Sequence, residues 1–158
     1  MLTRAASSPT RARYVLHHPR PLDRVALDQV AAAATGQHRF TAFTPSRTAH
    51  TYFDRTILEC RWIDRDDELV LIIRANAFLR HMVRVLVGTM LAVGRGECSL
   101  VEFHAMLAGA PRSEAFQTAP PQGLCLVDVT WQPVDGVGVP PRWRAGRSDG
   151  LPPFAHQL

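Results

Sequence analysis

The chain has 158 residues and a formal net charge of +4, and all 18 of its basic residues are arginine. With 46% hydrophobic and 20% charged residues it can bury a core, which excludes a wholly disordered chain. No apolar run approaches the ~18 residues that cross a bilayer. The length fits one domain. The positive charge favours a polyanionic partner, although the codon bias of a GC-rich genome explains the missing lysines at least as well.

The chain ends and the cysteines carry few functional signals. Residues 1–12 are expected to be a disordered start that lacks the apolar segment of a secretory signal, and an irregular start is favoured over a transit peptide. Residues 132–158, rich in Pro, Gly and Arg, are expected to be a disordered tail, which leaves one domain over 13–131. The cysteines form no C-x-x-C pair, so we expect no metal site, and reduced thiols of this kind are typical of a cytoplasmic protein. These cysteines are Cys60, Cys98 and Cys125.

The first half of the chain contains three predicted strands and one predicted helix. Arg13–His17 is a short strand candidate. Leu22–Thr35 has helical spacing of its apolar residues and is followed by Gly36, a common helix stop. Phe53–Asp64 alternates well enough for a strand. After a charged turn, Leu69–Arg74 is a fully apolar strand.

The second half begins with the strongest predicted helix, Phe78–Val93. Ser99, with Glu102 three residues later, forms a capping box that starts a helix over Ser99–Ala108. Gly123–Trp131 alternates as a final strand. The resulting order, β-α-β-β-α-(α)-β, predicts an α+β fold of ferredoxin-like or RRM-like type, with an antiparallel sheet and helices on one face.

The helix over 78–95 carries a basic stripe. A helical wheel at ~100° per residue places Arg80, Arg84 and Arg95 on one narrow face, with His81 beside them. No acidic residue lies between 69 and 96, so no carboxylate of this helix pairs with these arginines. Their partner is then a carboxylate from elsewhere, a phosphate or solvent. The pattern alone favours an ordinary solvated face over a site.

Several motifs in a row resemble one family. FLRHMVRVLVGTMLAVGRGECSLVEF (78–103) followed by TAPPQGLCLVDV (118–129) resembles the C-terminal half of the tRNA pseudouridine synthase A (TruA) family. GQHRFTAF (36–43) is similar to the family's G-x-H-D-F-x-x-F element, with Arg39 in place of the aspartate, and the R-T-I triplet that starts at Arg55 is similar to another. The resemblance covers about Tyr14 to Trp131.

This resemblance implies an enzyme that isomerises uridine to pseudouridine in the tRNA anticodon stem-loop, without metal or organic cofactor, and that works as a homodimer. The family's catalytic aspartate belongs to a motif, G-R-T-D-A-G-V-H-A, that this chain does not contain. The chain therefore resembles the C-terminal portion of such an enzyme. The resemblance implies tRNA as a partner, together with a homodimer or a complementary N-terminal half.

Residue by residue, the resemblance makes Arg84 the active-site arginine that would pair with the missing aspartate. Thr118 and Leu124 correspond to the loop and strand that line the uridine pocket. Four residues become candidates for contacts with the RNA backbone. Three of them are arginines, whose guanidinium groups suit phosphate geometry. These are Arg80, His81, Arg95 and Arg55.

Three hypotheses follow. The chain is part of a tRNA pseudouridine synthase, a catalytically empty RNA-binding module, or a remnant that folds poorly. Because the residues of a catalytic site fail together when one is missing, we expect the isolated chain to be inactive on tRNA.

Overall fold

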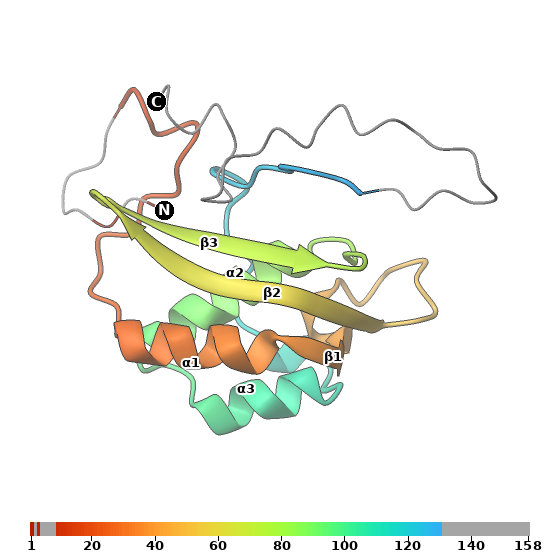
Figure 1. Ribbon diagram of the computed structural model, residues 1–158. Coiled ribbons are helices and arrows are strands. Elements are labelled where there is room, and N and C mark those ends of the chain that lie inside the picture. Colours follow the sequence, from red (N-terminus) through yellow and green to blue (C-terminus); the bar gives the residue numbers. More distant parts are fainter. Residues whose placement is uncertain (2, 4–8, 131–158) are drawn as a thin grey trace. The chain divides into compact units, whose positions relative to one another are not determined.

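The computed structural model describes residues 1, 3 and 9–130, and the chain divides into two compact units, Met1–Gly123 and Leu124–Leu158. In the described residues every helix and strand belongs to the first unit (Figure 1). No described helix is long and apolar enough to cross a membrane.

The first helix, α1, spans Arg24–Ala34, which confirms the helix predicted over 22–35. It starts at Asp23, whose carboxylate accepts a hydrogen bond from the Ala26 amide at 3.1 Å. This cap satisfies one of the amides that the first turn of a helix leaves without an intrahelical partner.

Three antiparallel strands form the sheet in the order β1-β2-β3. The short β1, Gly36–Arg39, pairs with the start of β2, Asp54–Arg65, and β2 forms a long hairpin with β3, Glu68–Ala75. The predicted strands over 53–64 and 69–74 are therefore confirmed. β1 was not predicted, because four residues with alternating exposure and a single neighbouring strand leave almost no pattern in the sequence. It is followed by a 3-10 helix, η1, over Phe40–Phe43.

The second half contains α2, Met82–Gly94, α3, Leu100–Leu107, and a short 3-10 helix, η2, Arg112–Glu114. The capping box of α3 is confirmed: the Glu102 amide donates to the Ser99 hydroxyl at 3.2 Å, and the Ser99 amide donates to the Glu102 carboxylate at 2.7 Å. α2 begins four residues later than predicted.

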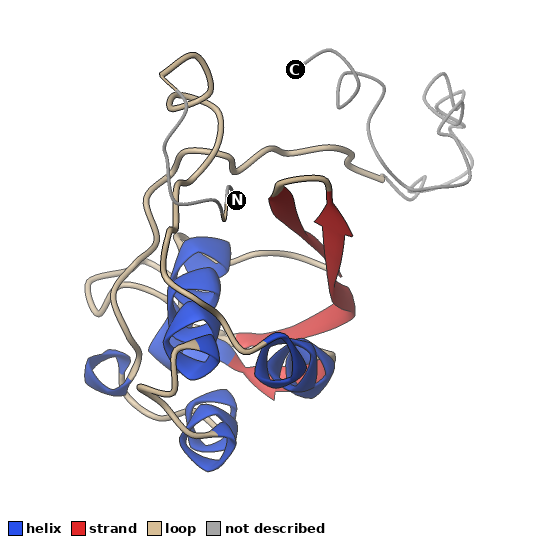
Figure 2. Ribbon diagram, turned by 90° about the vertical axis from the view of Figure 1, so that its left-hand side faces the viewer, coloured by secondary structure: helices blue, strands red, loops and turns tan. Residues whose placement is uncertain are grey.

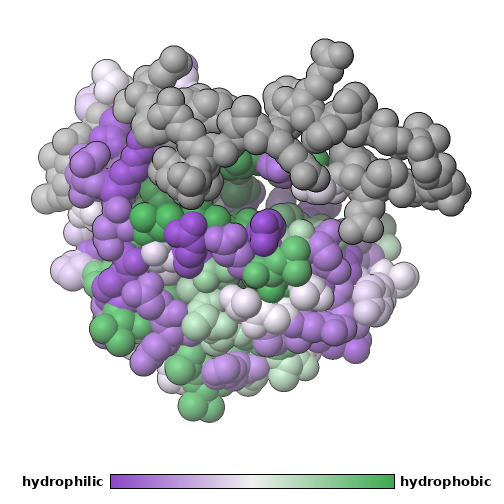
Figure 3. All heavy atoms as spheres, in the orientation of Figure 1, coloured by the Kyte–Doolittle hydropathy of each residue, from purple (hydrophilic) through white to green (hydrophobic). Residues whose placement is uncertain are grey.

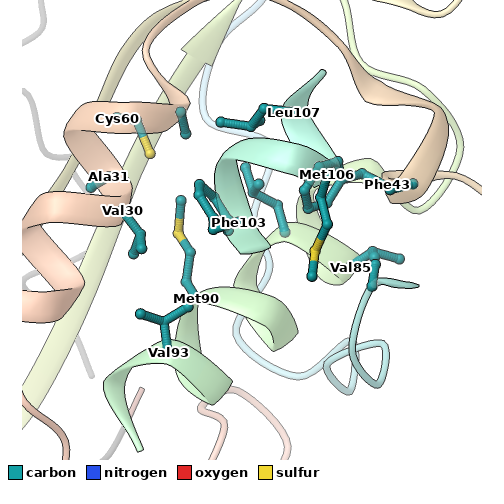
Figure 4. Packing of buried hydrophobic residues seen from close by; sticks show 14 of the residues in the cluster. Val30, Ala31, Phe43, Cys60, Val85, Met90, Val93, Phe103, Met106 and Leu107 are labelled. Carbon is teal, nitrogen blue, oxygen red and sulfur yellow. The ribbon is translucent and has the colours of Figure 1, made fainter. Parts of the chain in front are cut away.

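The helices lie on one side of the sheet, which confirms the predicted α+β arrangement (Figure 2). The core fills the space between these layers, and Figure 4 shows Val30 of α1, Met90 of α2 and Phe103 of α3 pointing toward one another. Burying the apolar surface of these side chains stabilises the folded state by about 25 cal/mol for each Å² removed from water. The largest fully buried residues include Phe40, Phe43, Phe103, Leu27, Ile57, Met82, Leu86 and Met90.

Neither predicted outer strand forms among the described residues, where His17 is only an isolated bridge residue, so the predicted β-α-β-β-α-(α)-β order was wrong. Arg13–His17 begins in a turn, in which the Tyr14 and Val15 amides both donate to the Arg11 carbonyl. Residues 124–130 of the predicted strand Gly123–Trp131 form no strand, and Trp131 lies outside the described residues. Alternation makes a segment suitable for a strand, but a strand exists only where a neighbour supplies the hydrogen bonds of the ladder.

The described residues near the N-terminus contact the β2–β3 hairpin. The Met1 amino group donates to the Leu69 carbonyl at 2.8 Å, and the Leu69 amide donates back to the Met1 carbonyl at 2.8 Å. Arg11 forms ion pairs with Asp67 and Glu68. The predicted domain limits, 13 and 131, stay a prediction, and the predicted tail over 132–158 lies outside the described residues.

Hydrophilic residues cover much of the face seen in Figure 3, with hydrophobic groups between them. Exposed apolar side chains include Val25 of α1, which is 66% exposed, and Leu58 of β2, which is 53% exposed. Isolated exposed apolar side chains of this kind are normal on a soluble surface and mark no site by themselves.

Candidate functional site

Arg84 lies half-buried in the first turn of α2. Its Nε donates to the Ala119 carbonyl at 2.8 Å, and the Ala119 amide donates back to the Arg84 carbonyl at 3.0 Å. Among the described residues no carboxylate pairs with Arg84, and neither of its Nη atoms has a hydrogen-bond partner. The first turn also contains no acidic residue. The positive end of the helix dipole and a guanidinium therefore coincide, and both attract an anion.

The loop that contacts Arg84 approaches α2 at Gly88. A Cβ atom at this glycine would lie 1.9 Å from the Gln117 carbonyl oxygen and 3.2 Å from the Ala119 nitrogen. Any side chain at position 88 would therefore push the loop off the helix. Beside this contact, the buried Thr89 hydroxyl accepts a hydrogen bond from the Phe116 amide at 3.3 Å.

Arg112, which the sequence reasoning missed, holds the other side of this loop. Its Nη1 donates to the Ala115 carbonyl at 2.9 Å, and its Nη2 donates to the Phe116 carbonyl and to the Thr118 hydroxyl, each at 3.2 Å. No spacing signals such a role, because every partner lies in an irregular segment. Gly88 did leave a signal, since a glycine inside an apolar helix often marks a close backbone approach.

The two predicted pocket residues differ in what can be described of them. Thr118 is half-buried, and its hydroxyl is occupied by Arg112, one residue before the Ala119 that contacts Arg84. Leu124 begins the second unit and is 53% exposed. A role for Thr118 beside Arg84 is therefore compatible with the loop, and the pocket role of Leu124 stays a prediction.

The predicted arginine stripe was wrong for Arg80, which lies outside the helix. Arg80 precedes α2 in a turn, and Arg95 is the residue that ends it. His81, between them in sequence, has a left-handed backbone with φ of 60°, which interrupts the helix before Met82. Arg84 and Arg95 stand at opposite ends of α2, about 16 Å apart along the axis at ~1.5 Å per residue. Arg80 and His81 are exposed beside the Arg84 end of the helix.

Arg95 has a local acidic partner. Its Nε and Nη2 donate to the two carboxylate oxygens of Glu97 at 2.8 and 2.6 Å. These hydrogen bonds hold the pKa of Glu97 below its usual range and raise the pKa of Arg95. Nearby, burial and the positive charges of Arg95 and Arg20 lower the pKa of His18. The Arg95 end of α2 is thus a locally paired cluster.

Arg55, at the start of β2, is tied to its own neighbourhood. Its Nη1 donates to the Asp54 and Tyr52 carbonyls at 2.7 and 3.2 Å, and its guanidinium lies 5.9 Å from the centre of the Tyr52 ring. Its Nε is buried and has no partner in the described structure. Tyr52 is 61% exposed, so the pair presents a stacking surface and a cation to solvent.

Comparisons with known proteins identify the family of this chain. A family model described as tRNA pseudouridine synthase matches residues 30–132. The chain belongs to the tRNA pseudouridine synthase family. A protein of Syntrophotalea carbinolica called tRNA pseudouridine synthase A is 39% identical over 130 residues, which cover 82% of this chain and 52% of that protein. Proteins of the same name from Chloroflexus aurantiacus and Anoxybacillus flavithermus are 39% and 38% identical over 82% and 75% of this chain, and over 48% of each relative.

The chain spans about half the length of these curated relatives. Gly88, Arg84 and the loop around Ala119 all lie within the matched residues. In the described part of the chain, no group of three or more His, Cys, Asp or Glu residues is placed to hold a metal ion.

Proposed function

We propose that this chain supplies one portion of a tRNA pseudouridine synthase, an isomerase that converts uridine to pseudouridine in the anticodon stem-loop of tRNA. The observation that supports the proposal is Arg84: a half-buried guanidinium, held by Ala119, with two unpartnered Nη atoms and no carboxylate paired to it among the described residues. This is the arrangement required of an arginine whose carboxylate arrives from another part of the protein.

The chemistry gives Arg84 a defined task. Pseudouridine formation breaks an N-glycosidic bond, turns the base and joins it again through carbon, on a nucleotide extruded into a closed pocket. A carboxylate performs this work only if it stays ionised, and an apolar pocket would raise its pKa. Arg84 would hold that carboxylate ionised and aimed. Thr118 and Leu124 would line the uridine pocket, and no metal or organic cofactor would take part.

The expected partners are tRNA and a second polypeptide. Arg80 and His81, exposed next to the Arg84 end of α2, would contact the RNA backbone, as would Arg55. Arg95 would contribute least to RNA binding, because it must first release Glu97. A complementary N-terminal half would bring the catalytic aspartate, and the assembled enzyme would be a homodimer. We expect this assembly in the cytoplasm, where the free thiols of Cys60 and Cys98 stay reduced.

Release of tritium from tRNA labelled at C5 of uridine tests the proposal. The purified chain alone should release no label. Addition of an N-terminal half that contains G-R-T-D-A-G-V-H-A should restore release, and the same half with its aspartate changed to asparagine should not. Turnover by the chain alone would contradict the divided site, whereas tRNA binding with no turnover in any combination would favour the catalytically empty RNA-binding module.

A further inference from the structure

Arg112 makes three hydrogen bonds to one short segment of its own chain. The acceptors are the carbonyls of Ala115 and Phe116 and the hydroxyl of Thr118, at 2.9 to 3.2 Å. All three are neutral, and in the described structure no carboxylate forms an ion pair with Arg112. A planar guanidinium with several donors in fixed directions suits such a task, which the compact ammonium of lysine cannot reproduce. The side chain therefore acts as a clamp on the backbone of the loop.

The clamped loop ends at the group that orients Arg84. Thr118 is held by Arg112, and its neighbour Ala119 exchanges two hydrogen bonds with Arg84. The bond from the Arg84 Nε to the Ala119 carbonyl fixes the plane of the guanidinium, because the Nε lies in that plane. Both Nη atoms are left for another partner. The direction of these free donors thus depends on where the loop places one carbonyl.

The loop has other attachments to the rest of the chain, and none of them bonds the groups that Arg112 holds. The Phe116 amide donates to Thr89 of α2, and the Gln117 carbonyl lies against Gly88. These contacts attach the loop to the helix, and the Ala115 side chain is buried in the core. Among the described residues, however, only Arg112 donates side-chain hydrogen bonds to the Ala115 carbonyl and the Thr118 hydroxyl. Without Arg112 the loop would keep these contacts and the bond from the Ala119 amide to Arg84, but it would lose the bond that holds Thr118, the residue before Ala119.

We propose that Arg112 is a positioning residue for Arg84: it fixes the Ala119 carbonyl and thereby pre-orients the guanidinium toward its anionic partner. The proposal rests on the proposed function of Arg84. Its physical basis is pre-organisation, since an arginine held in its productive rotamer loses less conformational entropy when it binds. Arg112 itself need not touch RNA or the reacting carboxylate.

The first test measures the hydrogen bond that the proposal concerns. Hydrogen exchange of the Arg84 Nε–H, identified by NMR through its loss in R84K, should accelerate about tenfold or more in R112Q, because the bond would open more often. R112K should resemble R112Q, since the charge is kept and the clamp is lost. The matched control is R61Q, which removes an exposed arginine of β2 that pairs with Glu59. Unchanged Arg84 exchange in R112Q, with only a lower melting temperature, would overturn the proposal.

The second test separates positioning from direct RNA contact. Affinity for an anticodon stem-loop RNA, at one fixed salt concentration, should fall about three- to tenfold in R112Q, and R112Q should add no loss in an R84Q background. Additive losses would overturn the proposal, because they would mean that Arg112 binds RNA by itself. If the unaltered chain does not bind the RNA, the proposed function is at fault, and the exchange measurement still decides the role of Arg112.

A milder variant covers the case in which R112Q does not fold. T118V removes one of the three acceptors and keeps Arg112 in place. We expect faster exchange of the Arg84 Nε–H in this variant, by less than in R112Q, with the exchange of the Val85 and Met90 amides in α2 unchanged. Equal acceleration at all of these sites would indicate general destabilisation and would overturn the proposal.

Discussion

The two ends of α2 each carry an arginine, and the two arginines differ in what holds them. Arg84, at the start, is bound to a backbone carbonyl and leaves two donors free, whereas Arg95, at the end, forms two hydrogen bonds to the carboxylate of Glu97. A neutral partner and a charged partner affect the charge of the guanidinium differently. The carbonyl orients the guanidinium without cancelling its charge, while the carboxylate cancels it.

The comparison shows why the number of arginines on a helix says little about binding. A paired arginine must give up its carboxylate before it can bind a phosphate, and an oriented, unpaired one need not. The candidate site is therefore placed at the start of α2. The predictions below test this difference between the two ends.

The largest difference is expected in activity. In the assay with the complementary N-terminal half, R84Q should lower the rate of tritium release by ~100-fold or more, as loss of a pre-organised charge at an active site typically does. R95Q should stay within about twofold, because it breaks a partly exposed ion pair at the opposite end of the helix from Arg84. The two variants remove the same charge from the same helix, so each controls for the other. Equal losses would abolish the distinction between the two ends.

Stability measurements should also distinguish the packing of the loop against the middle of α2 from the packing at the C-terminal end of the helix. G88A should lower the free energy of unfolding by about 2–3 kcal/mol, although alanine is the better helix former, because its methyl group meets the Gln117 backbone. G94A, at the last residue of α2, meets the side chains of Leu27 and Leu22 at 2.9 and 3.1 Å. Side chains give way more easily than backbone, so its cost should be smaller.

Urea unfolding of the two glycine variants at one temperature measures this difference. An equal or larger loss in G94A would mean that the loop at Gly88 moves aside at little cost. In that case the loop is not held firmly enough to orient Arg84, and the comparison of the two ends would lose its structural basis.

The smallest expected effect is on how the stability of the fold depends on pH, through Glu97 at the Arg95 end of α2. The hydrogen bond from Arg95 lowers the pKa of Glu97 below its ordinary value of 4.5. A carboxyl whose pKa is lower in the folded state stabilises the fold above its unfolded pKa and loses this contribution as the pH falls through the folded pKa. Wild-type protein should therefore be slightly more stable than E97Q at pH 6, with the difference vanishing on acidification below pH 4.5.

Thermal unfolding of both proteins over this pH range gives the difference, in which the effect of Glu102 cancels. The effect of His18 contributes to the difference, because the charge of Glu97 raises the pKa of His18. A constant difference at all pH values would show that Arg95 and Glu97 are not paired in solution. Arg95 would then be as available to an anion as Arg84.

Local patterns predicted the elements that are stabilised locally. α1, α3 with its capping box, and the hairpin of β2 and β3 were all predicted within a few residues, because helical spacing, a Ser–Glu cap and a charged turn act between near neighbours. The outer strands failed because strand formation depends on a partner that the pattern does not specify.

The arginines show the same limit within the candidate site. Helical spacing placed Arg80, Arg84 and Arg95 on one face, but His81 has a left-handed backbone and α2 ends at Gly94, so only Arg84 is in the helix. Neither Glu97 as the partner of Arg95 nor Ala119 as the partner of Arg84 follows from the spacing. Arg112 gave no sequence signal, since its role depends on a loop that tertiary packing places.

The sequence by itself determined the helices, the central hairpin and, through its motifs, the family. Its positive charge suggested a polyanionic partner, and its resemblance singled out Arg84. Only the tertiary structure decided which arginine is paired and which is oriented and free. The reason is physical: periodicity records interactions between neighbours in the chain, while the state of a guanidinium depends on acceptors such as Ala119, 35 residues away, that folding brings to it.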